Sequence, residues 1–442
     1  MLRRSLALVL ALLLSPAAAG SARPSAAPRA ASLGALDVIA LEICYTTVLA
    51  RYYEPVDPGA LLTGARTGIA SYLASRGIGA PRFPALPASA DRYRAESEID
   101  RDVALVVARY GTRVRTADLV EKTIAGELAA LHDPYTVLLP PAQFKKFVGF
   151  LDGRATAGIG AELDIDPQTH AVRIVDVFPD SPAEAAGLQP GDTLTAIDGR
   201  PPGASPADVA GALRGAPGST VRITFSRGGA AHEPVAIARK IMVPPDVTGR
   251  MLANGIAYVR IRSFGAQSPQ QLDAVLAKLR AAGARAYAVD LRANGGGYRD
   301  AAVAIGSHFV TGTIVTTRER TGRPMPFAAK AGVTPLGAPL AVLVDGDTAS
   351  AAEIVAGAIQ DDKTGKLVGT RTFGKGLVQE TFALPDGGAI KMTTARYLTP
   401  AGRDIDKVGI TPDVVVAQQP DAHPGEPGRD AQLDAALALL AS

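Results

Sequence analysis

The sequence predicts a multidomain α+β protein that consists of a helical N-terminal region, a small β-rich domain and an α/β core. Its 442 residues suggest two or three domains and leave ample room for buried cores. The hydrophobic spacing is helical as far as residue 151 and then becomes strand-like, with Gly, Pro and Asp turns between short apolar runs. From residue 242 onward, buried strands alternate with helical segments, which is typical of helices packed on a sheet.

The composition excludes several kinds of site. The chain has 46 Lys and Arg residues against 43 Asp and Glu, a net charge of +3, so we expect no basic surface and no nucleic-acid partner. Its single cysteine, Cys44, excludes an internal disulfide framework and a cysteine zinc cluster. Five scattered histidines leave few ways to build a metal site or a His-dependent triad. We therefore expect no metal and no other cofactor, and an enzyme of this composition needs a base other than His.

Residues 1–19 have the features of a secretory signal peptide: two basic residues, an apolar run too short to span a bilayer, and a small-residue cleavage site. Residues 20–34 are small and interrupted by proline, as in a linker. We expect an exported protein, periplasmic or extracellular, with no integral membrane segment after signal cleavage. An uncleaved anchor helix is the disfavoured alternative, because Pro16 and the short apolar run argue against it.

Residues 35–151 form the predicted helical region, in which apolar residues recur at helical spacing. Nothing in this region indicates chemistry. Glu54 and Asp133 stand beside prolines, and turn formation explains both carboxylates better than catalysis does.

Residues 152–241 form the β-rich domain, in which four predicted strands surround two short helices. The segments GIGAELDID and VFPDSPAEAAGLQPGDTLTAIDG resemble a PDZ domain of the bacterial protease type. The resemblance implies a carboxylate-binding loop made of Arg154, Gly158, Ile159, Gly160 and Ala161, whose backbone N–H groups hold a peptide C-terminus. The strand edge that follows the loop could pair with an extended peptide. A tight turn without a binding role is the alternative for these glycines.

Residues 242–418 form the predicted core, and residues 419–442 a C-terminal tail with a helix. Ligands of such α/β folds collect where strands end and helices begin. The first unusual junction is Asp290–Gly297, where three successive glycines follow a strand. Their N–H groups could face an anion or a developing oxyanion, but a flexible turn explains the run equally well. A phosphate loop is disfavoured because neither nucleotide-binding spacing is present.

The second junction places Ser350 between a strand and an amphipathic helix. Ser350 and Glu353 match a capping box, so a cap is the first interpretation and a nucleophile needs a base nearby. Lys375, between two glycines in a predicted strand over residues 372–377, is the candidate base, because a desolvated Lys can lose its proton and Arg cannot. Gln379 would lie on the same strand face as Lys375 and could hydrogen-bond it.

Together these residues resemble the carboxyl-terminal processing peptidases, or tail-specific proteases, a Ser/Lys peptidase family whose core is a spiral of the crotonase and ClpP kind. The motifs that carry the resemblance occur in the family's order: DLR-x-N-x-GG, S-A-x-E-I, FGKG-x-VQ, YLTPAGR and GI-x-PD. It implies that Ser350 is the nucleophile, that Lys375, 25 residues later, is the general base, and that Gln379 orients Lys375. It further implies an oxyanion hole formed by the backbone N–H groups of Gly296 and Ala351.

The sequence departs from the family pattern at a few positions. Thr348 and Ala352 replace common serines around the nucleophile, and Gly295 replaces a common proline in the glycine loop. Residues 71–115 are longer than the usual N-terminal region, and the sequence offers no account of them.

The resemblance implies a serine endopeptidase that cleaves protein substrates with free C-termini, with the PDZ domain binding the substrate tail and regulating activity. The sequence leaves open whether the protein binds an adaptor or forms a homo-oligomer. A secreted PDZ adaptor with an inactive core is a second hypothesis, disfavoured because a binding module needs neither Ser350, Lys375 nor Gln379. A small-ligand-binding protein of the same core fold has no supporting pocket motif and ranks last.

Overall fold

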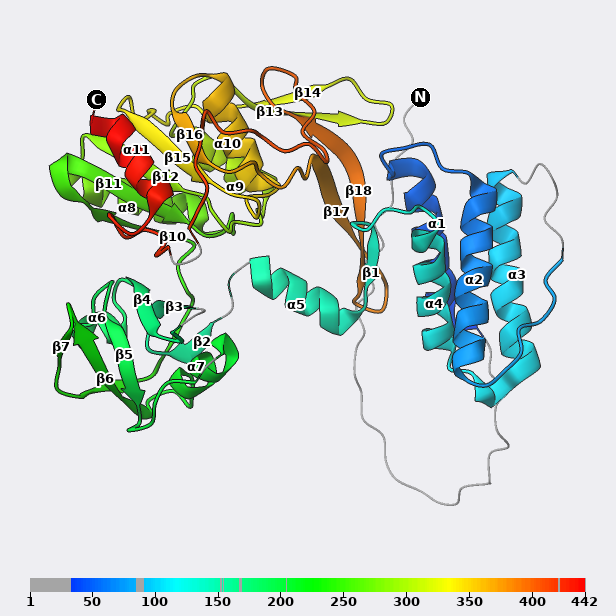
Figure 1. Ribbon diagram of the computed structural model, residues 1–442. Coiled ribbons are helices and arrows are strands. Elements are labelled where there is room, and N and C mark those ends of the chain that lie inside the picture. The colour runs from blue at the N-terminus through cyan, green and yellow to red at the C-terminus, as the bar shows by residue number, and fades with distance from the viewer. Residues whose placement is uncertain are drawn as a thin grey trace, which may run out of the picture.

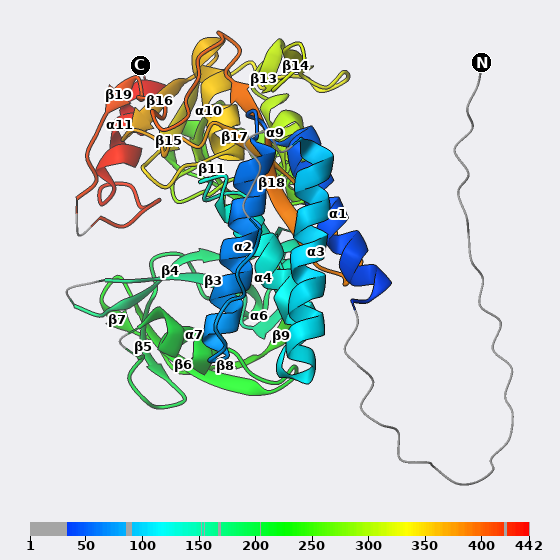
Figure 2. The same cartoon turned by 90° about the vertical axis from the view of Figure 1, so that its right-hand side faces the viewer.

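The computed structural model describes residues 33–84, 91–151, 153, 155–166, 169–203, 205–419 and 422–441 (Figure 1). The predicted signal peptide, nearly all of the predicted linker and Arg154 lie outside these residues. None of the helices in the described part is both long and apolar enough to cross a bilayer. The predicted combination of a helical region, a β-rich domain and an α/β core is confirmed (Figures 1 and 2).

Four helices form the N-terminal region and pack side by side (Figures 1 and 2). They are α1 (Ala35–Arg51), α2 (Pro58–Ser75), α3 (Arg92–Tyr110) and α4 (Thr116–Ala129). The Asp57 and Asp91 side chains accept hydrogen bonds from the first turns of α2 and α3, as N-caps do. Helix α3 occupies much of the stretch 71–115 that the sequence left without an account, and buries its apolar face against the other helices.

Helices α2 and α4 approach closely through glycines. A Cβ atom on Gly68 would lie 2.0 Å from the carbonyl oxygen of Lys122, and one on Gly126 would lie 2.2 Å from that of Gly64. No side chain fits between the two backbones at these points, so the close helix crossing requires glycine.

A short strand that the sequence did not predict joins the helical region to the core. This strand, β1 (Val137–Leu139), pairs antiparallel with β18 (Ala389–Leu398). The sheet continues with β13 (Thr313–Glu319) and β14 (Met325–Ala328), while β17 (Leu377–Ala383) also pairs with β18. Apolar residues of the β17–β18 hairpin pack into the helical core: Leu384, Ile390 and Met392. The helical region and this sheet therefore share one hydrophobic core.

Helix α5 (Pro141–Leu151) leads from the helical region to the inserted domain, as we call the part from β2 (Thr156–Gly158) to β9 (Lys240–Met242) (Figure 1). Strands β2 and β9 pair antiparallel, so the domain's two ends lie side by side. Its main sheet has the order β3-β4-β5-β6-β7, with β8 paired to β6. The elements are β3 (Ala161–Ile165), β4 (Val172–Val177), α6 (Pro182–Ala185), β5 (Thr193–Ile197), α7 (Pro206–Leu213), β6 (Thr220–Arg227), β7 (Ala230–Ala231) and β8 (Val235–Ala238).

The core is a six-stranded sheet of order β10-β11-β12-β15-β16-β19, parallel except for the β10–β11 pair. Its strands are β10 (Val247–Met251), β11 (Ile256–Ile261), β12 (Ala286–Asp290), β15 (Leu340–Val344), β16 (Lys366–Gly369) and β19 (Val414–Val415). One face is covered by α8 (Ser268–Ala281), α9 (Arg299–Gly306) and α10 (Ala351–Asp361). The other is covered by α11 (Ala431–Ala441), through Leu433 and Ala436. The predicted tail helix is thus an integral layer of the core (Figure 1).

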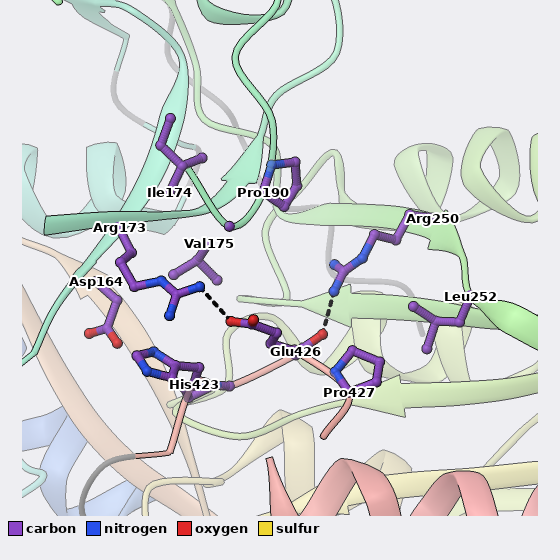
Figure 3. Close-up of a pocket in the computed structure, with 13 residues that line it drawn as sticks. Asp164, Arg173, Ile174, Val175, Pro190, Arg250, Leu252, His423, Glu426 and Pro427 are labelled. Atoms are coloured by element: carbon purple, nitrogen blue, oxygen red, sulfur yellow. Dashed lines mark hydrogen bonds and ion pairs between the residues drawn. The ribbon is translucent and has the colours of Figure 1, made fainter. Parts of the chain in front are cut away.

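The C-terminal loop over residues 422–430 links the inserted domain to the core. Glu426 in this loop pairs with Arg173 of β4 at 2.8 Å, and the Gly425 carbonyl accepts a hydrogen bond from Arg250 of β10 (Figure 3). A second set of ion pairs joins Arg262, which follows β11, to Glu162 and Asp176 of the inserted domain. The inserted domain is therefore held to the core at two separate polar contacts.

Candidate active site

A cavity of about 1140 Å³ collects all five residues that the sequence assigned to catalysis. Ser350, Ala351, Lys375, Gln379 and Gly296 line it together. Its remaining walls come from apolar residues of α5, from the segment between β9 and β10, and from β17 and β18. A second cavity of about 220 Å³, between the inserted domain and the C-terminal loop, contains none of the five (Figure 3).

Ser350 stands at the N-cap of α10 in a strained conformation, with φ 57° and ψ −117°. N-cap residues ordinarily have extended backbone, so a cap alone does not explain this geometry. A non-glycine residue held in such a region costs about 1–3 kcal/mol and is found mostly at functional sites. The backbone therefore favours a role for the hydroxyl over the capping interpretation.

The turn that carries Ser350 is fastened to the loop after β12. The Ala349 N–H donates to the Asn294 carbonyl at 2.9 Å, and the Thr348 hydroxyl donates to the Leu291 carbonyl at 2.9 Å. From the other side, the Tyr397 hydroxyl donates to the Ser350 carbonyl at 3.1 Å. These contacts fix the Ser350 turn against the glycine loop.

The glycine loop lies against Ser350 as the oxyanion prediction requires. A Cβ atom on Gly296 would lie 2.8 Å from the Ser350 Cβ, so only glycine fits at this position, where φ is 99°. The Ala351 N–H is the first of α10 and has no acceptor inside the helix. The Gly296 N–H, in contrast, donates to the Asn294 Oδ1 at 2.9 Å, so this second predicted donor is already engaged.

Lys375 lies in a loop over residues 371–376, and the predicted strand over residues 372–377 is wrong because β17 begins only at Leu377. A Cβ on either flanking glycine would meet backbone atoms of residues 405–409, so the loop packs closely on that segment. The Lys375 ammonium lies 4.9 Å from the ring centroid of Tyr135. Among the described residues, its side chain has no hydrogen bond to Ser350.

The environment of Lys375 favours the neutral amine. Burial lowers the pKa of Lys375 below its ordinary value, and the nearby charge of Lys391 lowers it further. The carboxylates of Glu353 and Asp133 oppose the shift. Desolvation is the larger effect, so Lys375 releases its proton more readily than an exposed lysine does.

Gln379 lies in the same cavity as Lys375 but not on a shared strand face, so that part of the sequence argument is wrong. Its amide donates to the Thr393 hydroxyl at 3.4 Å, and the strand register shifts between Val378 and Gln379. The Thr393 hydroxyl in turn donates to Asp133 at 2.6 Å. Asp133, which follows the last helix of the helical region, is thus connected to Gln379 by hydrogen bonds through Thr393.

Sequence reasoning missed three residues at this site. Glu353 was interpreted as half of a capping box, yet its carboxylate also reaches the Lys375 loop. Asp133 was interpreted as a turn residue, and it does bond the Tyr135 N–H and the Thr136 hydroxyl within its own turn. Only their long-range contacts distinguish these residues, and no local pattern indicates such contacts. Tyr135, whose ring centroid lies 4.9 Å from the Lys375 ammonium, is the third.

In the inserted domain, the described part of the predicted carboxylate loop, Gly158–Ala161, connects β2 to the edge strand β3. Gly160 has φ 81°, and a Cβ there would lie 2.4 Å from the Ser181 Cβ. The Ile159 carbonyl accepts a hydrogen bond from Ala183, which ties the turn to α6. Ala161 begins β3, whose outer edge is free of strand pairing within the described sheet.

The arrangement in the cavity suits acyl transfer. The hydroxyl of a serine with strained backbone, an amine with a lowered pKa and the first N–H of a helix, which has no acceptor inside that helix, meet in one cavity. Over the described ranges, no group of three or more His, Cys, Asp or Glu side chains is placed to hold a metal ion.

Comparison with known proteins agrees with this geometry. Residues 255–416 match the family model described as Peptidase family S41, and residues 173–227 match a PDZ domain model. The chain is 38% identical over 336 residues to the carboxyl-terminal-processing protease of Picosynechococcus sp. (strain ATCC 27264 / PCC 7002 / PR-6), covering 74% of this chain and 80% of that protein. It is 31% identical over 353 residues to the carboxy-terminal processing protease CtpB of Bacillus subtilis (strain 168), covering 77% and 72%.

A solved structure has a similar fold over most of the chain. The photosystem II D1 C-terminal processing protease is 26% identical and superposes with a TM-score of 0.51. The superposition covers 92% of this chain and 98% of that one.

Proposed function

The chain belongs to peptidase family S41 and is a serine-type peptidase with a PDZ domain, and on that premise we propose that Ser350 is its nucleophile and Lys375 its general base. The family and the enzyme class that the sequence predicted are confirmed. The observation that carries the assignment is the strained Ser350 turn, which shares a cavity with a lysine of lowered pKa.

The proposed reaction begins when neutral Lys375 takes the proton of the Ser350 hydroxyl, whose oxygen attacks the scissile carbonyl carbon. The Ala351 N–H binds the oxyanion, and the Gly296 N–H joins it when the loop releases it from Asn294. Protonated Lys375 then gives its proton to the leaving amine, and the acyl-enzyme remains on Ser350. A water molecule, deprotonated by Lys375, attacks that ester, and Lys375 then returns the proton to the departing Ser350 oxygen, which releases the acid product.

We propose that the substrates are proteins cleaved near a free C-terminus, and that the PDZ domain binds the tail and regulates cleavage. The names of the relatives, carboxyl-terminal-processing proteases, support the substrate class. The unpaired edge of β3 beside the Gly158–Ala161 turn supports tail binding, because an extended peptide can add to such an edge. An adaptor protein or self-association is compatible with this proposal.

The proposal includes export to the periplasm or the extracellular space, supported by the signal-like residues 1–19. Cell fractionation with an antibody against the core tests it, and recovery of the full-length chain from the cytoplasm alone would contradict it.

Mutation of the two residues tests the dyad. We expect Ser350→Ala and Lys375→Ala each to lose at least about 1000-fold in kcat on an unstructured protein with an apolar tail, because nucleophile and base act as one unit. Product mass spectrometry identifies the cleavage site, and a serine-directed fluorophosphonate should label the wild type at Ser350. Full cleavage by either folded variant would exclude the dyad.

A further inference from the structure

Glu353 connects the two catalytic segments. Its side chain is wholly buried in the first turn of α10, 0% exposed to solvent. One carboxylate oxygen, Oε2, accepts hydrogen bonds from the backbone N–H groups of Ser350 and Lys375, each at 2.9 Å. The other, Oε1, accepts from the Thr372 hydroxyl at 2.6 Å and the Gly374 N–H at 2.8 Å.

All four partners are donors, so the contacts suit an ionised carboxylate, which can only accept hydrogen bonds. Four charge-assisted bonds compensate for the burial of its charge. The capping interpretation accounts for one of them, the bond from Ser350. The other three come from residues 372–375, about twenty positions further along the chain.

We propose that Glu353 is a positioning residue, which sets the separation of the Ser350 hydroxyl and the Lys375 amine by binding the backbones of both residues with one oxygen. The proposal rests on the Ser350 and Lys375 assignment made above.

Other hydrogen bonds also join the two catalytic segments, but over the described ranges none of them comes from a single group that binds both Ser350 and Lys375. The glycine loop and Tyr397 hold the Ser350 turn, and Tyr397 also reaches the 371–376 loop, because its N–H donates to the Gly376 carbonyl at 2.9 Å. That bond goes to the residue after Lys375 and not to Lys375 itself. The Lys375 loop is held mainly by residues 405–410, through the Lys407 N–H to the Gly374 carbonyl and the Ile410 N–H to the Thr372 hydroxyl. One further backbone bond, from Phe373 to Thr348, joins the two segments, but it bypasses both reacting residues.

Glu353→Gln is the informative variant, because Gln has nearly the size of Glu but offers one acceptor oxygen in place of two. The NH2 group of Gln would replace one carboxylate oxygen and would face the two hydrogen-bond donors that this oxygen accepts from in the wild type. We expect kcat to fall about 100-fold, the order of loss for misplaced reacting groups, with KM nearly unchanged. Labelling of Ser350 by the fluorophosphonate should slow in parallel.

The pH profile separates positioning from general loss of structure. The charge of Glu353 raises the pKa of Lys375, so its removal lowers that pKa and moves the acid limb of kcat/KM to lower pH. Glu127→Gln is the matched control, since Glu127 is a wholly buried glutamate of the helical region. This control should leave both kcat and the acid limb as in the wild type.

A folded Glu353→Gln variant with wild-type kcat, or with a lowered kcat and an unmoved acid limb, would overturn the proposal. If Glu353→Gln does not fold, Thr372→Val tests the proposal instead. It removes one of the four hydrogen-bond donors to Glu353 and keeps the charge of the Glu353 carboxylate. We expect Thr372→Val to lower kcat several-fold without moving the limb, and unchanged kcat would contradict the proposal. A wild-type protein that neither cleaves nor is labelled would instead refute the dyad itself.

Discussion

Two lysines face the active-site cavity, and burial lowers the pKa of both. Lys375 is the proposed base, while Lys391 on β18 contributes a positive charge that favours the neutral form of Lys375. The Lys391 ammonium also lies 5.6 Å from the ring centroid of Phe147 on α5. At the scale of single residues, burial and one like charge lower the pKa of Lys375, and the carboxylates of Glu353 and Asp133 oppose them.

Lys391→Met tests this arrangement. Without the neighbouring charge the pKa of Lys375 rises, so a larger fraction of Lys375 is protonated at neutral pH. We expect activity that increases with pH in both proteins, an acid limb of kcat/KM at higher pH in the variant, and an equal plateau above it. Lys122→Met, at an exposed lysine of α4, is the control and should not move the limb. An acid limb in Lys391→Met that stays in place or moves to lower pH would contradict the argument.

At the scale of secondary structure elements, the closest helix contact is the crossing of α2 and α4. The helices meet backbone to backbone at Gly64, Gly68 and Gly126, with no space for side chains. Helix α4 ends just before the Asp133 turn, so the crossing also fixes where that turn meets the core.

Gly68→Ala should therefore weaken the helical region. The added methyl group would lie 2.0 Å from a backbone carbonyl, so the helices must separate, and we expect a loss of about 1–3 kcal/mol in the free energy of unfolding. Urea unfolding followed by circular dichroism measures it. Gly211→Ala in α7, where a Cβ meets nothing within 4 Å, should instead gain about 1 kcal/mol from helix propensity. Equal stabilities for Gly68→Ala and wild type would show that the helices relax freely.

The sequence predicted elements better than contacts between them. The predicted alternation of buried strands and helices from residue 242 onward is confirmed, because strands and amphipathic helices differ in hydrophobic period. Lys375 was placed in a strand because the two flanking glycines, which serve close packing, were not interpreted as loop residues. The roles of Glu353 and Asp133 depend on partners 22 and 260 residues away, and no local periodicity reports such contacts.

At the scale of the whole molecule, the inserted PDZ domain is tied to the core by the C-terminal loop (Figure 3) and, at a separate place, by Arg262. The same loop leads to Asp430, whose buried carboxylate pairs with Arg292 at the end of β12. Arg292 directly precedes the glycine loop of the active site, and Asp290 pairs with it from the strand. One loop thus contacts both the PDZ domain and the base of the glycine loop.

Excision of the PDZ domain tests its proposed role in tail selection. Thr156 and Met242 are paired across β2 and β9, so a short Gly-Ser linker can replace residues 157–241 without stretching the chain. The wild type should cleave a substrate with a free apolar tail faster than its C-terminally amidated form. We expect the ratio of kcat/KM for the two substrates to fall toward one after excision. Glu426→Ala, which removes the Arg173 pair and a longer ion pair to Arg429 within the same loop, controls for loosening of the domain and should keep the preference. An unchanged ratio in the excised protein would refute tail selection by this domain.

The pairing of β1 with β18 has a consequence for the order in which the molecule can be completed. Val137 in β1 pairs with Lys391, and Asp133 accepts a hydrogen bond from Thr393. These contacts of the N-terminal half can form only after residues near the end of the chain have been synthesised. Contacts of such long sequence separation form late in folding, because closing the long intervening loop costs conformational entropy before the contact forms. A chain interrupted before residue 389 would hold Ser350 and Lys375 without the strand that places Asp133 and Tyr135 beside them. Proteolytic competence should therefore arise in a single late step of folding, which limits premature cleavage of other proteins by the growing chain.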